Sequence, residues 1–175
     1  MRIEGSYDLP QERERIFALL VDEEVLRRCV PGCEKLVREG ADRFAATLQA
    51  GLGPVSGRYE GTVTISEREP PGKLALAIEG TGKLGWLKGK GVLRLDEGGS
   101  GGTRVVYRGD VQVGGSIAGV GQRMIQGAAL AMAGQFFAAL QAEAKAAAEA
   151  RPPPRQGLLR NLLRWIAASL RRWWR

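Results

Sequence analysis

The chain has 175 residues, a net charge of +7 and no histidine, and seven of its 26 basic residues lie in residues 151–175, which contain no acidic residue. The length allows one domain with a sizeable core and a short appendage, and the lack of histidine removes the most common general base and metal ligand. Because residues 1–150 are formally neutral, we do not expect this body to bind nucleic acid.

The N-terminal segment 1–32 predicts a strand followed by two short helices. Residues 2–9 can form the opening strand, and Pro10 suits the first turn of the helix after it. A second short helix is expected to begin at Asp22, its N-cap, and to end before Pro31 and Gly32.

From there to about residue 113, apolar and polar residues alternate with the period of two that is typical of strands. The inward sets are Phe44/Ala46/Leu48, Tyr59/Gly61/Val63/Ile65, Leu74/Leu76/Ile78, Leu93/Leu95 and Val105/Tyr107/Gly109/Val111/Val113. No helical segment interrupts them, so the pattern predicts an antiparallel sheet with one face in water.

A long helix is predicted from Ser116, as its N-cap, to about Ala150. Its apolar stripe is Ile117, Val120, Met124, Ala128, Met132, Phe136 and Leu140. Small residues are expected to face the interior from the strands and from the start of the helix: Ala46, Ala50, Gly61, Gly109, Gly119, Gly121 and Gly127. They either enclose a cavity or allow close packing, and periodicity alone leaves both interpretations open.

Two short motifs resemble known functional sites, but the sequence around them gives little support for these functions. Cys29 and Cys33 form a C-x-x-x-C arrangement, which is either a redox pair or two partly buried small residues around a turn. The segment Gly80–Gly85 matches G-x-G-x-x-G, but a strand pattern follows it instead of a helix, so we reject a dinucleotide site. We expect a glycine-rich loop whose Trp86 and Leu87 form a lid at a cavity mouth; the alternative is that Trp86 plugs the end of the core.

Three blocks of the sequence resemble the family of the G subunit of carbon monoxide dehydrogenase. They are VDEEVLRRCVPGCEKL (21–36), GPVSGRYEGTV (53–63) and VGGSIAGVGQRMIQGAALAMAGQFFAAL (113–140). The resemblance spans roughly residues 1–145 and implies the START-like, SRPBCC helix-grip superfamily. It therefore implies an α+β domain over residues 1–150, in which a curved antiparallel sheet wraps around the long C-terminal helix and an apolar cavity.

The resemblance also implies an accessory role without catalytic residues. Our first hypothesis is a carrier that binds a lipophilic molecule, a quinone, with no metal ion and no covalently bound cofactor. From the inward positions we expect the ligand to contact Phe44, Leu48, Tyr59, Val63, Leu76, Trp86, Leu87, Tyr107, Ile117, Val120, Met124 and Met132. The alternatives are an enzyme of the cyclase type, for which Tyr59 and Tyr107 are the only inward polar candidates, and a docking scaffold with a filled core.

The partner that the resemblance implies is a molybdenum hydroxylase of the carbon monoxide dehydrogenase type. Members of the family are implicated in placing that enzyme at the membrane, where its electrons enter the quinone pool. No apolar run near the N-terminus could act as a signal peptide, and two cysteines fit a reducing compartment. We therefore expect peripheral attachment at the cytoplasmic face of the cell membrane.

The C-terminal segment predicts how this attachment is made. Residues 151–157 form a proline-rich linker, and residues 158–175 predict an amphipathic helix. Its membrane-binding residues are expected to be Leu159, Leu163, Trp165, Ile166, Leu170, Trp173 and Trp174, with Arg160, Arg164 and Arg171 on the polar side. Because its longest uncharged stretch is only residues 165–170, far below the ~20 apolar residues of a span, we expect it to lie on an anionic membrane surface. Docking into a groove of a partner protein is the alternative.

Overall fold

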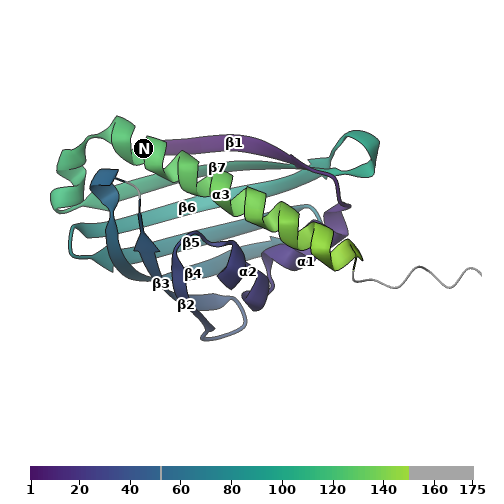
Figure 1. Ribbon diagram of the computed structural model, residues 1–175, viewed down its shortest axis with the longest axis horizontal. Helices are drawn as coiled ribbons and strands as arrows, with labels where there is room; N and C mark the ends of the chain where they lie inside the picture. The colour runs from purple at the N-terminus through teal and green to yellow at the C-terminus, as the bar shows by residue number, and fades with distance from the viewer. Residues whose placement is uncertain (52, 150–175) are drawn as a thin grey trace, which may run out of the picture.

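One sheet of seven antiparallel strands, crossed by one long helix, makes up the fold in the computed structural model, which describes residues 1–51 and 53–149 (Figure 1). The strands are β1 (Arg2–Leu9), β2 (Cys33–Arg38), β3 (Arg43–Ala50), β4 (Gly57–Glu69), β5 (Lys73–Gly82), β6 (Gly85–Glu97) and β7 (Thr103–Gly114). The helices are α1 (Arg13–Leu20), α2 (Glu23–Cys29) and α3 (Gln122–Glu149), with short 3₁₀ turns η1 (Gly53–Val55), η2 (Gly99–Gly101) and η3 (Ser116–Val120). The predicted linker and amphipathic segment, residues 151–175, lie outside the described residues.

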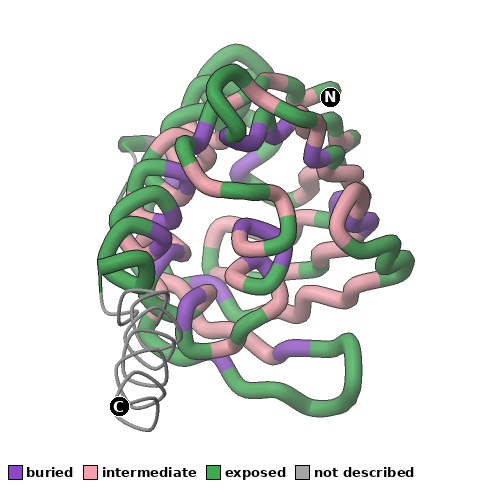
Figure 2. Tube along the Cα trace, turned by 90° about the vertical axis from the view of Figure 1, so that its right-hand side faces the viewer, coloured by how far each residue is buried: buried purple, intermediate pink, exposed green. Residues whose placement is uncertain are grey.

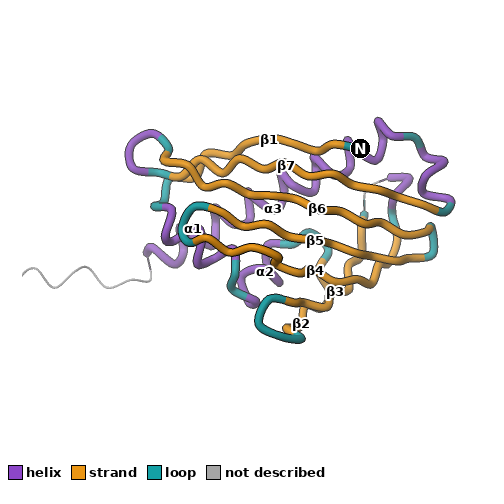
Figure 3. Tube along the Cα trace, turned by 180° about the vertical axis from the view of Figure 1, so that it is seen from behind, coloured by secondary structure: helices purple, strands orange, loops and turns teal. Residues whose placement is uncertain are grey.

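The strands follow the spatial order β1-β7-β6-β5-β4-β3-β2, seen from behind in Figure 3. Successive strands from β2 to β7 pair with each other, while α1 and α2 carry the chain from one edge of the sheet to the other. β1 therefore pairs with β7, the last strand in the chain, with Arg2 opposite Asp110. The predicted α+β fold, with a curved antiparallel sheet and a long C-terminal helix, is confirmed.

The strong curvature of the sheet has local causes. The register shifts between Ile65 and Glu67, where β4 carries a bulge against β5. At Gly61 the neighbouring strand comes so close that an added Cβ would overlap the carbonyl oxygen of Glu79. A side chain at position 61 would push the two strands apart, so the bend requires glycine there.

The long helix begins later than predicted. Ser116 is not its N-cap: the Ser116 hydroxyl donates to the Leu84 carbonyl at 2.9 Å, and Ser116–Val120 form the separate turn η3. Gly121, with φ of +95°, breaks the backbone before α3 starts. Because φ is positive there, the residue cannot continue a right-handed helix.

The break also shifts the buried stripe. On α3 the buried residues are Ile125, Phe137, Leu140 and Ala144, whereas Met124 is 54% exposed. The predicted stripe was wrong at Met124 because its period was counted from Ile117 across the break. Figure 2 shows that the buried positions of α3 lie on its side toward the sheet.

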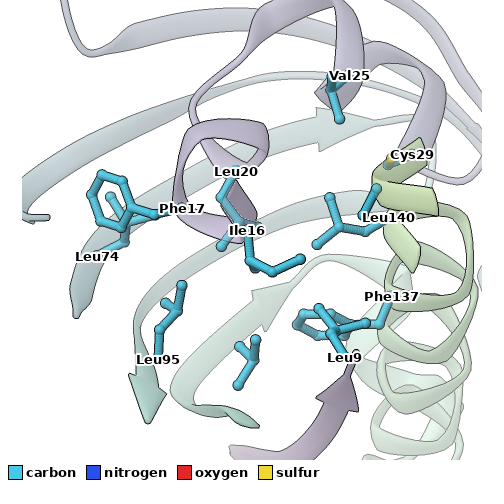
Figure 4. Packing of buried hydrophobic residues seen from close by; sticks show 12 residues of the cluster. Leu9, Ile16, Phe17, Leu20, Val25, Cys29, Leu74, Leu95, Phe137 and Leu140 are labelled. Atoms are coloured by element: carbon cyan, nitrogen blue, oxygen red, sulfur yellow. The ribbon is translucent and has the colours of Figure 1, made fainter. Parts of the chain in front are cut away.

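The core consists of two clusters at opposite ends of α3. The large cluster joins α1, α2 and the second half of α3 to the sheet (Figure 4), and it contains Leu9, Ile16, Phe17, Leu20, Val25, Cys29, Leu74, Leu95, Val105, Phe137, Leu140 and Ala144. The small cluster lies around η1, η3 and the start of α3, and it contains Val55, Tyr59, Ile117 and Ile125. Neither cluster fills the middle of the sheet.

Candidate functional site

Between the two clusters lies a set of apolar side chains that are only half-buried. We call it the central inner face and define it as Val63 on β4, Leu76 and Ile78 on β5, Leu87 on β6 and Val111 on β7. Strand alternation places these residues on the same face as Leu74 and Leu95 of the large cluster, toward α3. They belong to neither cluster. Apolar residues that face a covering helix yet keep accessible surface are packed less tightly than the residues of the two clusters.

Several glycines lie on the inner face of the sheet beside these residues, but they do not all leave room: an added Cβ at Gly89, which is buried, would lie 3.0 Å from Cγ1 of Ile78 and 3.4 Å from Cγ2 of Val111. The inner positions of β6 between Leu87 and Leu93 are Gly89 and Gly91, and Gly109 of β7 lies opposite Gly91. An added Cβ at Gly91 would meet only backbone, at 3.4 Å from the carbonyl oxygen of Arg108 and 3.7 Å from the Cα of Gly109, which is ordinary contact. A larger side chain could therefore be introduced at position 91 and would project toward the interior.

The glycines at the start of the helical region were also predicted to leave volume in the interior, but they do not. Gly119, Gly121 and Gly127 are exposed, and an added Cβ at any of them would meet nothing within 4 Å. The prediction that they leave volume inside is wrong, because Gly119 and Gly121 belong to η3 and its break, and Gly127 lies on the outer side of α3.

An aromatic group borders the central inner face at the large cluster. The ring centroids of Tyr7 and Tyr107 lie 4.5 and 5.8 Å from that of Phe137, and all three rings are stacked. Burial, with a smaller effect of Tyr7, raises the pKa of Tyr107, so its hydroxyl stays protonated and can donate a hydrogen bond. Tyr7 was not predicted as a ligand residue, although alternation along β1 places it on the same face as Leu9.

At the other end, the predicted ligand residues belong to the small cluster. Tyr59 and Ile117 are buried, and Val120 packs against them. The Tyr59 hydroxyl donates to the carbonyl of Val55 at 3.0 Å, and burial raises its pKa. This hydrogen bond holds the turn η1 in place. The Tyr59 hydroxyl is therefore a poor candidate for proton transfer.

Two further predicted residues lie on β3. Phe44 is buried, and the guanidinium carbon of Arg38 lies 4.6 Å from its ring centroid, which is a cation–π contact at the sheet edge. Leu48 is half-buried and pairs with Tyr59 across the strands. Phe44 therefore closes the edge of the sheet, while Leu48 adjoins the small cluster.

A small pocket lies between the turn after α2, the end of β3 and the middle of α3. Its volume is about 110 Å³, and it is lined by Pro31, Gly32, Gln49, Ala50, Gly51, Met132 and Gln135. Met132 is the only predicted ligand residue among them. The pocket combines two side-chain amides with apolar walls, so it can accept a molecule with a polar end.

The predicted lid does not exist. Trp86 and Leu87 are both strand residues of β6, and only Lys83 and Leu84 form the turn that joins β5 to β6. Successive strand residues point to opposite faces, so Leu87 faces α3 while Trp86 lies on the outer face. There an added Cβ at Gly114 would overlap the indole ring. Trp86 therefore lies outside the interior.

The cysteines have little chemistry in this arrangement. Burial, with a smaller contribution from Glu143, raises the pKa of Cys29 to about 11. Burial also raises the pKa of Cys33. Both thiols are protonated near neutral pH, and the thiolate is the reactive form. Within the described part of the chain, no three His, Cys, Asp or Glu side chains are grouped as metal ligands.

None of the helices within residues 1–51 and 53–149 combines the length and the hydropathy of a membrane span. The membrane-binding residues predicted in the tail lie outside the described residues.

Comparisons with known proteins identify relatives of this fold. The family model described as the G subunit of carbon monoxide dehydrogenase (CoxG) matches residues 5–145. A conserved protein from Geobacillus kaustophilus of known structure is 31% identical, with a TM-score of 0.80, over 83% of this chain and 95% of that chain. A START superfamily protein from Mycobacterium smegmatis is similar in fold alone, with 12% identity and a TM-score of 0.63, over 82% of this chain and 97% of that chain. A search of curated proteins found no match.

Proposed function

Because the chain belongs to the CoxG family of carbon monoxide dehydrogenase, we propose that it is a non-catalytic accessory protein that binds a quinone and links a molybdenum hydroxylase to the membrane. Family membership and the START-like fold support a ligand-binding accessory protein. We further propose three specific features. The ligand is a quinone, the partner is an enzyme of the carbon monoxide dehydrogenase type, and the protein attaches to the cytoplasmic face of the membrane.

The central inner face is the observation that supports ligand binding. Its residues, among them Leu76, Ile78 and Leu87, are apolar and stay half-buried although they face α3. Burying them under a ligand would gain about 25 cal/mol for each Å² of apolar surface removed from water. A lipophilic ring with an apolar chain is a suitable ligand, because none of the residues that define this face is charged.

The aromatic group supplies the polar and stacking contacts that a quinone ring needs. Tyr107 and Tyr7 present flat rings beside Phe137. Stacked aromatic pairs contribute about 0.5–1.5 kcal/mol beyond the area that they bury. The protonated Tyr107 hydroxyl can donate to a ring carbonyl oxygen. In this proposal the protein holds and releases the quinone, and the electron transfer belongs to the partner enzyme.

Mass spectrometry of lipophilic molecules extracted from the purified full-length protein tests the ligand part directly. We expect a quinone, and we expect a short-chain ubiquinone analogue to bind saturably. Replacing Gly91 with Leu would fill the interior and should weaken this binding at least tenfold. The matched control is Gly127→Leu, whose side chain would point into solvent.

Equal quinone affinity in the wild type, Gly91→Leu and Gly127→Leu, together with no extracted lipophile, would contradict the carrier function and favour a docking scaffold. Thermal unfolding of each variant checks that Gly91→Leu is folded. A folded Gly91→Leu protein that has lost quinone binding would support the interior site, because the outer surface is unchanged.

The membrane part rests on residues 158–175, which combine three tryptophans with five arginines and no acidic residue. Such a composition suits the plane of a bilayer interface. Deleting residues 156–175 should abolish co-sedimentation with vesicles made from a mixture of phosphatidylcholine and anionic phosphatidylglycerol. Unchanged co-sedimentation after the deletion would overturn the role of this segment.

A further inference from the structure

The outer face of the β5–β6 hairpin carries an exposed tryptophan among lysines. Trp86 is 40% exposed, and Lys88 and Lys90 follow it on the same face of β6. Lys83 occupies the turn before them. We call Lys83, Trp86, Lys88 and Lys90 the hairpin patch. The quinone site does not use it, because it lies on the face of the sheet opposite to α3.

The patch is held in place by the body of the protein. The carbonyl of Leu84, in the hairpin turn, accepts hydrogen bonds from the Ser116 hydroxyl at 2.9 Å and from the Ile117 amide at 2.8 Å. The Leu84 side chain packs against the small cluster. On the outer face, the indole of Trp86 lies directly over Gly114. The tryptophan is thus presented on a fixed surface, and ordering it costs little on binding.

The charges around Trp86 are mainly positive. Lys88 forms one exposed ion pair, with Glu79 at 3.2 Å. Lys83 and Lys90 are exposed and form no ion pair with any carboxylate of the described residues. Segment 80–90 contains three lysines and no acidic residue. Its acidic neighbours across the strands are Glu79 opposite Lys88, Glu60 opposite Thr81 and Asp110 opposite Lys90.

The acidic residues at the border of the patch are already paired. Glu60 lies 3.9 Å from Arg58, and Asp110, which is opposite Lys90, lies 3.8 Å from Arg2. Both pairs are exposed and contribute little stability. They leave the excess of positive charge on the hairpin patch unbalanced.

We infer that the hairpin patch is a second membrane contact, which places Trp86 among the headgroups of an anionic leaflet. Tryptophan is enriched at bilayer interfaces, and each basic residue there strengthens binding about fivefold. Lysine is depleted in protein–protein interfaces, which makes an acidic protein surface the less suitable occupant. The inference rests on the proposed membrane attachment and adds a site to it.

The position of the patch gives this second contact a consequence. Figure 1 shows the β5–β6 turn and the end of α3 at opposite ends of the molecule. The tail continues the chain from the end of α3, through a proline-rich linker of residues 151–157. An anchor at each end would fix the orientation of the body on the membrane, because two separate contacts define the axis that joins them.

The test uses the full-length chain with Trp165, Trp173 and Trp174 replaced by Phe, so that Trp86 is the only tryptophan. The vesicles are the same mixture of phosphatidylcholine and phosphatidylglycerol, with part of the phosphatidylcholine brominated. On binding, we expect the emission of Trp86 to shift to the blue and to be quenched by the brominated lipid. The matched control carries Trp86→Phe and Leu130→Trp, which moves the reporter to an exposed position of α3, on the face of the molecule opposite to the hairpin patch; it should not be quenched.

A second measurement uses charge. Lys83→Gln together with Lys90→Gln should lower the vesicle partition coefficient by roughly 25-fold, at about fivefold for each lysine. Lys35→Gln removes an exposed lysine of β2 and should leave the partition coefficient unchanged.

The outcomes separate this inference from the proposed function. The full chain could bind vesicles with no more quenching at Trp86 than at the control position. This result would overturn the membrane contact of the hairpin patch, while the tail would remain the proposed anchor. No vesicle binding by the wild-type chain, with its three tail tryptophans in place, would overturn both.

Discussion

The large cluster and the central inner face are made of the same residue types but are packed differently. In the large cluster, Ile16 and Leu140 have no exposed surface, and three helices close over one end of the sheet. On the central inner face, Leu76 and Ile78 keep part of their surface accessible under the single helix α3. The first region provides stability, and the second keeps apolar surface accessible, as the proposed ligand site requires.

This difference follows from where α1 and α2 lie. They cover only the end of the sheet that holds the large cluster, because the chain uses them to cross from β1 to β2. The middle of the sheet is left to α3, whose inward residues there include alanines and Met132. A region that one helix covers with small side chains cannot reach the packing density of a region covered by three.

The largest expected effect is that of a cavity in the large cluster. Leu140→Ala removes a side chain with 0% exposure and should lower the free energy of unfolding by about 2–5 kcal/mol. Urea denaturation monitored by circular dichroism measures the loss. On the central inner face, Leu76→Ala should cost less than half as much but should weaken quinone binding. Equal costs at the two positions would show that the two regions are packed alike.

The next effect concerns the bend of the sheet. Gly61→Ala places a methyl group against the Glu79 carbonyl, which is backbone and cannot rotate away, so we expect a loss of about 1–3 kcal/mol. Gly91→Ala should cost clearly less, because its new methyl group makes only ordinary contacts. Thermal unfolding of the two variants compares them. A larger loss at Gly91 would mean that the interior has no spare room there.

Thiol reactivity tests how tightly the large cluster is closed, without a change in sequence. Cys29 belongs to the large cluster, and burial raises its pKa to about 11. Cys33 is only half-buried. At pH 7.5 we expect iodoacetamide to modify Cys33 faster, and Cys29 to react at a comparable rate only after unfolding in urea. Peptide mass spectrometry assigns the sites. Faster modification of Cys29 in the native protein would show that this end of the core opens readily.

The smallest effect is a dependence on pH at the surface of the large cluster. Arg28 of α2 donates to Glu143 of α3 at 2.8 and 2.9 Å, and this contact lowers the pKa of Glu143 below its ordinary value of 4.5. The contact should therefore stabilise the fold above pH 4.5 and be lost as the pH falls through the lower pKa of the folded state. In urea titrations, the stability difference between the wild type and Glu143→Gln should shrink from pH 6 to pH 3.

A matched change at an exposed carboxylate without an ion pair among the described residues, Glu14→Gln, should leave the pH profile of stability nearly unchanged. A Glu143→Gln profile that is parallel to the wild type over this range would show that the Arg28–Glu143 contact does not persist in solution.

Local sequence patterns were sufficient for the strands and for the existence of the long helix. The period of two over β3 to β7 predicted the inward residues, because side chains in a strand alternate without exception unless a bulge intervenes. The resemblance over three blocks then predicted the helix-grip architecture. Neither source could predict that Phe44 lies beneath Arg38, since this contact depends on the register between the edge strand β2 and its neighbour β3.

The wrong predictions for the helix start and for the lid have one common cause. In both places a glycine adopts a conformation that the sequence does not reveal. Gly121 breaks the chain before α3, so a helical period counted from Ile117 assigned Met124 to the interior. Gly82 and Gly85 end β5 and begin β6 around a two-residue turn, so an expected lid became a hairpin with Trp86 on the outside. In both places a glycine was interpreted as space or flexibility, whereas the structure uses it for a fixed turn.

The pairing of β1 with β7 has a consequence for the order in which the protein is made. Leu9 lies opposite Thr103, and Arg2 opposite Asp110, so the partner of the first strand is about 100 residues away in the chain. A ribosome that adds roughly 5–20 amino acids per second needs about 5–20 s to reach that partner. During this interval β1 has no strand to pair with, and β6 is the open edge of the growing sheet. Translation must therefore proceed beyond residue 114 before the sheet can be completed.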